Sequence, residues 1–431
     1  MVWSSPAQAQ ESAIPAPSNL KDAVVTTLTT HPDVRSAWQN YLASKQQTRQ
    51  AVAGYYPTLD LTAAYGRENS DNTTTRGAGR GSYTLNRGES GLALSQMLFD
   101  GFETIYDVKR ADAAEASTMQ AFHQTSENTG LSAVEAYLES YKQSLQIQLI
   151  AQNIEDHKEI LEKAELKAKS GAGNEADVEQ TKSRLSLAEA NAAAIGGAAR
   201  LAAAKYERII GHPPKELQEP KLPDLELPDD LQGLIAKALD EHPSLRGAQL
   251  DMAASKATHK MNRAAFMPEV TFDIAATNNG NVSGTRGYAQ SVSAMLNMSY
   301  NLYNGGSDTA AYRESKQRIY QSQEAVALSQ RNIKEAVVVA WESMSIAKQR
   351  LELLNKQVDA AQKVVETYDK QFKLGRRSLL DLLNSKSELY TALSSQVNER
   401  FNYMTSVYRL WASMGSLRIK MNLADVDLAN Q

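Results

Sequence analysis

Residues with the types and spacing that chemistry requires are few in this sequence. The dipeptide His-Pro occurs at equivalent positions of two similar segments, as His31–Pro32 and His242–Pro243, and an imidazole can bind a metal ion or carry a proton. Proline is common in the first turn of a helix, so both dipeptides are better explained as junctions between two short helices. The glycine-rich run 77–81 has the composition of a phosphate loop, but such a loop joins a strand to a helix, and this run lies between two predicted strands. Neither pattern predicts a catalytic or metal-binding site.

The remaining sequence contains no zinc-binding helix motif, Walker phosphate loop or nucleophile elbow. Its 431 residues include no cysteine, which excludes disulfides, thiolate metal sites and a lipid-anchored cysteine. The formal net charge is -4 with acidic and basic residues interspersed, whereas a nucleic-acid-binding protein needs a basic patch or stripe. We therefore expect no enzyme, no cofactor, no metal ion and no nucleic-acid partner.

The sequence segments that would position any site occur as two similar copies along the chain. Residues 20–65 align with residues 231–276 at a constant offset, which pairs His31–Pro32 with His242–Pro243. Further on, the sequence LFDG at 98–101 matches LYNG at 302–305. Self-similarity over such a length indicates two copies of one structural unit.

Each copy contains one predicted β-hairpin. Apolar and polar residues alternate at 58–65 and 90–99 in the first copy and at 270–277 and 291–303 in the second, as in half-buried strands. The intervening segments 66–89 and 277–290 are rich in Gly, Asn, Ser, Thr and Arg, which is typical of surface loops.

The rest of each copy is predicted to be helical. The 12 prolines all lie at or before Pro57 or between Pro213 and Pro268, so long helices can run without interruption elsewhere. Apolar residues spaced by threes and fours predict helical hairpins at about 101–211 and 306–415, whose first helices would each be roughly 100 Å long. Glycines at the hairpin turns and ends are typical helix stops.

These elements give a domain plan. Residues 20–212 form the first repeat, 213–230 a proline-rich connector, 231–417 the second repeat and 418–431 a C-terminal tail. Residues 1–19 are interpreted as a signal-peptide remnant and extension, because Ala7-Gln8-Ala9 has the small-x-small form of a cleavage site.

Four strands are too few to close a barrel, and no apolar run is long enough for a membrane-spanning helix. Only helices and closed barrels satisfy their backbone polar groups in lipid. Three copies would supply twelve strands, an even number in the range of outer-membrane barrels. The predicted fold is therefore mainly α with a β-barrel portion: a trimeric twelve-stranded barrel of the outer-membrane type, continuous with a twelve-helix α-barrel.

Several motifs carry a resemblance to a known family. The twofold repeat, the two His-Pro dipeptides, the turns at 98–101 and 302–305, and above all the run 372–383 (FKLGRRSLLDLL) resemble the TolC family of outer-membrane efflux proteins over residues 20–417. The resemblance implies a homotrimeric duct in outer-membrane lipid whose α-barrel extends into the periplasm. Such a duct works with an inner-membrane transporter and a periplasmic adaptor protein and performs no chemistry.

The resemblance also assigns candidate sites. Asp381 matches an acidic residue that rings the periplasmic entrance, Arg377 a basic residue that holds it closed, and Asn384 stands where some relatives carry a second aspartate. Asp177 is the counterpart of Asp381 in the first copy. The adaptor would bind the tips of the two helical hairpins: Gly171, Ala172, Gly173, Leu374, Gly375, Arg376 and Ser378.

Arg377 and Asp381 allow two interpretations. They could form part of a latch at the entrance, where three symmetry-related carboxylates would favour cations. Alternatively, they could be a solvated pair on one helix face, worth a few tenths of a kcal/mol.

The sequence does not identify the exported substrate. The character of residues 20–61 favours type I protein secretion, and the alternative is a multidrug efflux duct paired with a proton-driven pump. An alternative of another class is a long coiled-coil scaffold or adhesin stalk, which explains the heptads but not the four strands.

Overall fold

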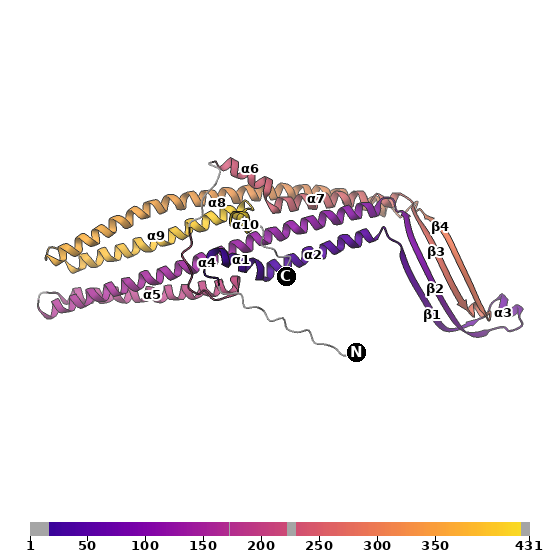
Figure 1. Cartoon of the computed structure of the whole chain (residues 1–431), viewed down its shortest axis with the longest axis horizontal. Coiled ribbons are helices and arrows are strands. Elements are labelled where there is room, and N and C mark those ends of the chain that lie inside the picture. Colours follow the sequence, from indigo (N-terminus) through magenta and orange to yellow (C-terminus); the bar gives the residue numbers. More distant parts are fainter. Residues whose placement is uncertain (1–16, 172, 222–229, 424–431) are drawn as a thin grey trace. The chain divides into compact units, whose positions relative to one another are not determined.

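The computed structural model describes residues 17–171, 173–221 and 230–423, which are mainly helical with one small sheet (Figure 1). The chain divides into two compact units. One, the helical unit, contains residues 1–38, 121–245 and 329–431, and the other, the sheet unit, contains residues 39–120 and 246–328. Most of the predicted signal-peptide remnant at 1–19, the end of the predicted tail at 418–431, and Ala172 lie outside the described residues.

The sheet unit contains one antiparallel sheet with the strand order β1-β2-β3-β4. Its register pairs Leu61 with Leu92, Ala93 with Ala275, and Phe272 with Leu296, with an irregularity between Met97 and Phe99. A short helix α3 (Thr73–Gly77) lies between β1 and β2, and a short 3-10 turn η2 (Val282–Gly284) lies between β3 and β4. The strands are β1 (Thr58–Ser70), β2 (Tyr83–Phe99), β3 (Glu269–Gly280) and β4 (Tyr288–Ser299).

The strands differ from the predicted ones at their ends. The first hairpin extends well into the segment 66–89 that was predicted to be a loop, because charged side chains pair across it: the Arg87 guanidinium lies 2.9 Å from Glu68. The second hairpin also extends into its predicted loop, to Gly280 and from Tyr288. At its other end β4 stops at Ser299 and not at 303, where the Asn301 side chain accepts a hydrogen bond from the Tyr303 backbone and forms a local turn.

Helices account for most of the remaining described residues. Two of them, α4 and α8, contain 67 residues each. Among residues 17–171, 173–221 and 230–423, no helix has both the length and the apolar character needed to cross a membrane. The helices are α1 (Leu20–Thr30), α2 (Pro32–Ala53), α4 (Glu103–Lys169), α5 (Glu175–Ile210), α6 (Leu231–Glu241), α7 (Pro243–Met261), the 3-10 turn η1 (Ala264–Phe266), α8 (Ser307–Lys373), α9 (Leu379–Ser413) and α10 (Leu417–Lys420).

The equivalent dipeptides His31–Pro32 and His242–Pro243 form helix junctions, which confirms the structural interpretation of these residues. His31 follows the last residue of α1, and Pro32 begins α2; His242 and Pro243 do the same between α6 and α7. The Nδ1 atom of His242 accepts a hydrogen bond from the Ser244 backbone at 3.2 Å, and His31 makes the equivalent contact. Each imidazole therefore caps the first turn of the following helix.

The core of the helical unit holds the beginning of the described chain. Tyr137 on α4 is fully buried, and its one hydroxyl proton is shared between the carbonyl oxygens of Ser18 and Gln218, which lie 2.7 and 2.8 Å from the hydroxyl oxygen. Tyr206 on α5, also fully buried, donates to the carbonyl of Pro17 at 3.4 Å. These contacts fix the segment before α1 against α4 and α5, and the connector after α5 against α4.

Candidate functional site

The sheet has two chemically different faces. Since side chains alternate along a strand, the register places one set of apolar residues on one side across all four strands. Many of them are open in the single chain: Leu61, Val292 and Tyr65 are 78%, 80% and 82% exposed. We call this the apolar face; it comprises Leu59, Leu61, Ala63, Tyr65, Leu92, Leu94, Val270, Phe272, Ile274, Ala276, Val292, Ala294, Leu296 and Met298.

The opposite face is polar and internally hydrogen-bonded. Asp273 on β3 accepts hydrogen bonds from Ser95 on β2 and Asn297 on β4, both at 2.5 Å. Nearer the loops, Arg87 pairs with Glu68 and Glu89. We call this the polar face. This face carries charged and hydrogen-bonding groups on β1, β2 and β3, so this side of the sheet suits contact with water.

Aromatic side chains mark both ends of the apolar face. At the loop end, Tyr65 on β1 and Tyr288 on β4 are each 82% exposed. At the helix end, Tyr56, Tyr300 and Tyr303 are also exposed. Rings with a polar tip placed at the two edges of an apolar band are typical of the two interfaces of a membrane.

The second candidate site is the turn between α8 and α9. Ser378 is the N-cap of α9: its hydroxyl accepts from the Asp381 backbone at 3.1 Å, and the Asp381 carboxylate accepts in return from the Ser378 backbone at 3.3 Å. This reciprocal arrangement is a capping box. The hydrogen bonds from Ser378 hold the pKa of Asp381 below its usual range, with a smaller contribution from Arg377. Asp381 is therefore a charged group fixed to the first turn of α9.

Arg377 contacts both helices of this hairpin. Its Nη1 lies 3.7 Å from the Asp381 carboxylate on α9. Its Nε donates to the Gln371 side chain on α8 at 3.1 Å, and its guanidinium lies over the Tyr368 ring, 4.3 Å from the centroid. The predicted pair of Arg377 and Asp381 thus exists, but both side chains are 40% exposed, and exposed pairs contribute little to stability.

Asp177 and Asn384 lie near this turn in different ways. Asp177 is half-buried in the first turn of α5, where Asn174 is the N-cap and accepts from the Ala176 backbone at 3.1 Å. It occupies the same position relative to its cap as Asp381 does. Asn384 is exposed on α9, one turn beyond Asp381.

The predicted tip residues form the turns between the paired helices. Gly171 and Gly375 adopt left-handed conformations with φ of 73° and 69°, which explains why glycine stands there. Leu374 is 69% exposed, and Gly173 and Arg376 are also exposed. Ser378 is engaged as the α9 cap, and Ala172 lies outside the described residues.

One apolar cluster joins the two hairpins just behind these turns. Its buried members come from three helices: Ile160 and Ala164 on α4, Val178 on α5, and Leu379 and Leu383 on α9. Because these residues come from both repeats, the first turns of α5 and α9 share one core.

Sequence reasoning missed the polar contacts between the repeats at this end of the helical unit. Lys386 on α9 lies 2.8 Å from Asp156 and 3.9 Å from Glu159, both on α4. The adjacent His157 is 4% exposed, and its Nδ1 has no hydrogen-bond partner within the described structure. Burial lowers the pKa of His157, and the nearby charges of Arg184 and Lys386 lower it further against the opposing effect of Asp156. The signal in the sequence was only a lysine and two acids, with no indication that they meet.

A second missed contact lies near the C-terminus. Glu127 on α4 is 4% exposed, and its two carboxylate oxygens accept from the backbone N–H groups of Leu417 and Arg418 at 2.8 and 3.1 Å. Burial raises the pKa of Glu127, and these backbone hydrogen bonds oppose that shift. The carboxylate therefore holds the start of α10 against α4.

Comparison with known proteins shows that the chain is similar to one protein family. The profile of the family described as outer membrane efflux protein matches residues 23–212 and 234–416, one segment for each repeat. The outer membrane efflux protein BepC of Brucella suis biovar 1 (strain 1330) is 26% identical over 349 residues, which are 78% of this chain and 76% of BepC. The alkaline protease secretion protein AprF of Pseudomonas aeruginosa is 25% identical over 422 residues, 95% of this chain and 86% of AprF.

Solved structures show the same fold. The CmeC outer membrane channel of Campylobacter jejuni superposes with a TM-score of 0.82 at 13% identity, over 96% of this chain and 90% of that one. The outer-membrane channel OprN superposes with a TM-score of 0.79 at 20% identity, over 92% of this chain and 90% of OprN. The tandem-repeat fold predicted from the sequence is therefore confirmed, as is an outer-membrane location that extends into the periplasm. The chain belongs to the outer membrane efflux protein family.

Proposed function

We propose that three copies of this chain form the exit duct of a tripartite export system, with a twelve-stranded β-barrel in the outer membrane. The observation that carries this proposal is the sheet, which has one exposed apolar face, one polar face and two open edges. In the order β1-β2-β3-β4, the outer edges of β1 and β4 have no neighbouring strand among residues 17–171, 173–221 and 230–423. Unpaired edges are not tolerated in lipid, so β4 of one copy would pair with β1 of the next.

The apolar face has the height that a membrane requires. From Tyr56 to Tyr65 the chain advances by nine residues, or about 30 Å at about 3.3 Å per residue. A strand tilt of about 40° would reduce this to about 23 Å, close to the apolar band of about 25 Å in outer-membrane barrels. The apolar face would contact lipid, and the polar face would line the water-filled duct.

We propose that the helical hairpins form a periplasmic tunnel whose tips bind a periplasmic adaptor and, through it, an inner-membrane transporter. The exposed residues Leu374 and Arg376 and the glycine turns at Gly171 and Gly375 offer the contact surface for this adaptor. Arg377, Asp381, Asp177 and Asn384 would surround the entrance, and the contact between Arg377 and Asp381 would help to keep it closed.

The substrate that we favour is protein, by type I secretion. The relative AprF, which is named for alkaline protease secretion, aligns with 95% of the chain. The second candidate is multidrug efflux, because the probable efflux pump outer membrane protein TtgC of Pseudomonas putida also aligns over 92% of the chain, at 22% identity. Deletion of the gene should remove specific proteins from the culture medium under the first proposal, and should raise drug sensitivity under the second.

Cysteine pairs provide a direct test of the barrel, because the chain has no cysteine of its own. Thr62→Cys on β1 would be combined in turn with cysteines at Ser291, Ser293 and Asn297 on β4, all on the polar face. Oxidation should link one register of this series into covalent trimers. Ala93→Cys with Ala275→Cys is the matched control, since these residues face each other within one sheet and should cross-link only inside a chain. A series that yields no intermolecular product would refute the proposed seam.

The entrance is tested by single-channel recording of the reconstituted trimer. Arg377→Ala and Asp381→Ala should raise the conductance, and Asp381→Ala should also weaken block by multivalent cations. Gln371→Ala, which removes only one hydrogen bond to Arg377, should have a smaller effect. If neither charge variant changes conductance or cation block, the two residues are a surface pair and not a latch.

A further inference from the structure

The loop end of the sheet is basic in an unusual way. The segments 66–89 and 277–290 contain five basic residues, all arginine and none lysine, against three acids. The chain as a whole has a net charge of -4. The bases are Arg67, Arg76, Arg80, Arg87 and Arg286, and the acids are Glu68, Asp71 and Glu89.

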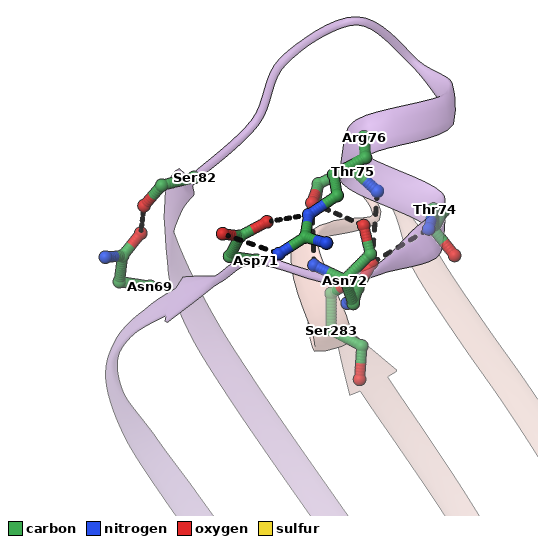
Figure 2. A network of polar contacts seen from close by, with 8 residues as sticks. All are labelled: Asn69, Asp71, Asn72, Thr74, Thr75, Arg76, Ser82 and Ser283. Carbon is green, nitrogen blue, oxygen red and sulfur yellow. Dashed lines mark hydrogen bonds and ion pairs between the residues drawn. The ribbon is translucent and has the colours of Figure 1, made fainter.

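All three acids are already occupied by two of the arginines. Asp71 accepts two hydrogen bonds from Arg76, at 2.7 and 3.2 Å (Figure 2). Glu68 and Glu89 both pair with Arg87. Three arginines therefore remain without a carboxylate partner among the described residues, and we call them the arginine rim: Arg67, Arg80 and Arg286.

The loops that carry the arginine rim are held in place. Asn72 accepts from the backbones of Thr74 and Thr75 at 3.0 Å and so caps α3. The same side chain donates to the Ser283 carbonyl at 2.9 Å, which ties the first hairpin to the second (Figure 2). Asn281 adds a second tie through its hydrogen bond to the Asn86 carbonyl at 2.8 Å. Little ordering of the backbone would be needed when a ligand binds.

Two members of the rim converge on one aromatic ring. The Arg80 guanidinium lies over Tyr83, 5.0 Å from the ring centroid, and Arg286 donates to the Tyr83 hydroxyl at 3.1 Å. Both arginine side chains are exposed. The phenol orients two positive charges without neutralising either of them.

Arg67, the third member of the arginine rim, has a defined position along β1 relative to the apolar face. Arg67 follows Tyr65 by two residues on β1, so it lies on the same side of the sheet as the apolar face and about 7 Å nearer the loops. Under the proposed barrel, Tyr65 lies at the membrane interface, and Arg67 reaches the headgroup layer beside it.

We propose that the arginine rim binds phosphate groups on lipid headgroups of the outer leaflet. This inference rests on the proposed barrel, which directs the loops outward. A guanidinium donates two parallel hydrogen bonds to a phosphate, which a lysine ammonium cannot do, and this explains the exclusive use of arginine. The position of Arg67 beside the apolar face favours a lipid over a soluble phosphate, because the acyl chains would lie on that face.

The test uses the full-length trimer in detergent and counts bound lipid by native mass spectrometry. The probes are lipid A with its phosphates and the same lipid after dephosphorylation. Removing one arginine should weaken binding of the phosphorylated lipid about fivefold, and Arg67→Gln with Arg80→Gln and Arg286→Gln should abolish the preference for phosphate. Replacing all three by lysine should retain only part of it. Arg76→Gln is the matched control, because it also removes one positive charge, but from an arginine that is paired with Asp71.

Each outcome decides one point. Equal binding by wild type and the triple glutamine variant would overturn the proposal, as would equal binding of the dephosphorylated lipid. If inorganic pyrophosphate at matched concentration displaces the lipid, the rim recognises soluble phosphate and the lipid assignment is wrong. A trimer that conducts in planar bilayers but shows no rim-dependent binding would refute this inference alone, whereas failure to form a conducting trimer would refute the proposed duct.

Discussion

Replacing Glu127 with alanine should free the start of α10 from α4 at a cost of about 3 kcal/mol in local opening free energy. The buried carboxylate accepts from the backbone N–H groups of Leu417 and Arg418 at 2.8 and 3.1 Å. Leu417 itself is 1% exposed, so alanine would leave its N–H group without an acceptor and with little access to water.

The magnitude follows from two opposing terms. A hydrogen bond to a charged group contributes about 1.5–3 kcal/mol, so two give about 3–6 kcal/mol. Burial of the carboxylate offsets part of this, as the raised pKa of Glu127 indicates. Glutamine keeps one acceptor oxygen and removes the charge, so Glu127→Gln should cost only about 1 kcal/mol.

Hydrogen–deuterium exchange of a peptide covering 417–423 in the intact trimer measures this opening. At about 1.4 kcal/mol per tenfold, Glu127→Ala should accelerate exchange roughly 150-fold. Glu135→Ala on the same helix is the control: it removes an ion pair to Arg409, which is 57% exposed, and should change exchange by less than about fivefold. If residues 417–423 exchange at the wild-type rate in Glu127→Ala, or if Glu135→Ala accelerates their exchange equally, the reasoning is refuted.

Three further predictions test the helical unit. Burial lowers the pKa of His157 in the folded state, so the unfolded chain binds the proton at a higher pH than the folded chain does. The free energy of unfolding should therefore decrease as the pH falls below 6.5, the ordinary pKa of histidine. The protection factors of amides near the tip, which are corrected for the intrinsic pH dependence of exchange, should therefore fall below about pH 6.5 in wild type but not in His157→Gln, and pH-independent protection factors in wild type would contradict this. Lys386→Met should show a coupling of about 1 kcal/mol with Asp156→Asn in a double-mutant cycle of thermal unfolding; additive effects would mean that the pair contributes nothing. Tyr137→Phe removes the hydroxyl proton that two buried carbonyl groups share and should cost about 2 kcal/mol, seen as faster exchange of residues 18–20, and unchanged exchange would exclude an anchoring role.

The helices were largely predictable because their ends are encoded locally. Prolines are missing from 269–431, and the first long run there ends at Lys373 just before Gly375. A glycine with positive φ next to a helix end is a rule that depends on neighbouring residues only. The repeat then supplies a second, independent copy of the same signals around Gly171.

The strand ends were not predictable from alternation, because the hairpin ends in charged pairs. Glu68, Arg87 and Glu89 look like loop residues in a sequence, yet they face one another on the polar side of β1 and β2. Alternation detects a strand only where one face is apolar. Near the loops that contrast is lost, so the predicted strands stopped too early.

The contacts between the two repeats could not be predicted from the sequence either. Lys386 and Asp156 are 230 residues apart in sequence, and Glu127 and Leu417 are 290 apart. A heptad pattern indicates that a helix has an apolar seam, but it does not say which turn of one helix lies beside which turn of another. That register comes from packing at the cluster of Ile160, Val178 and Leu383, whose members come from both repeats.

The two charged residues of the proposed latch are held in different ways, which separates their roles. Asp381 is bound into the capping box of its own helix, so its carboxylate would move with α9. Arg377 is held on α8 by Gln371 and Tyr368, and its 3.7 Å contact with Asp381 is its longest polar one. Outward movement of α9 would therefore break the contact between Arg377 and Asp381 before it disturbed either helix. Arg377→Ala would release α9 with its first turn intact, whereas Asp381→Ala would release it and also fray that turn. A conductance change shared by both variants would belong to the ion pair, and faster amide exchange at the start of α9 in Asp381→Ala alone would belong to the cap.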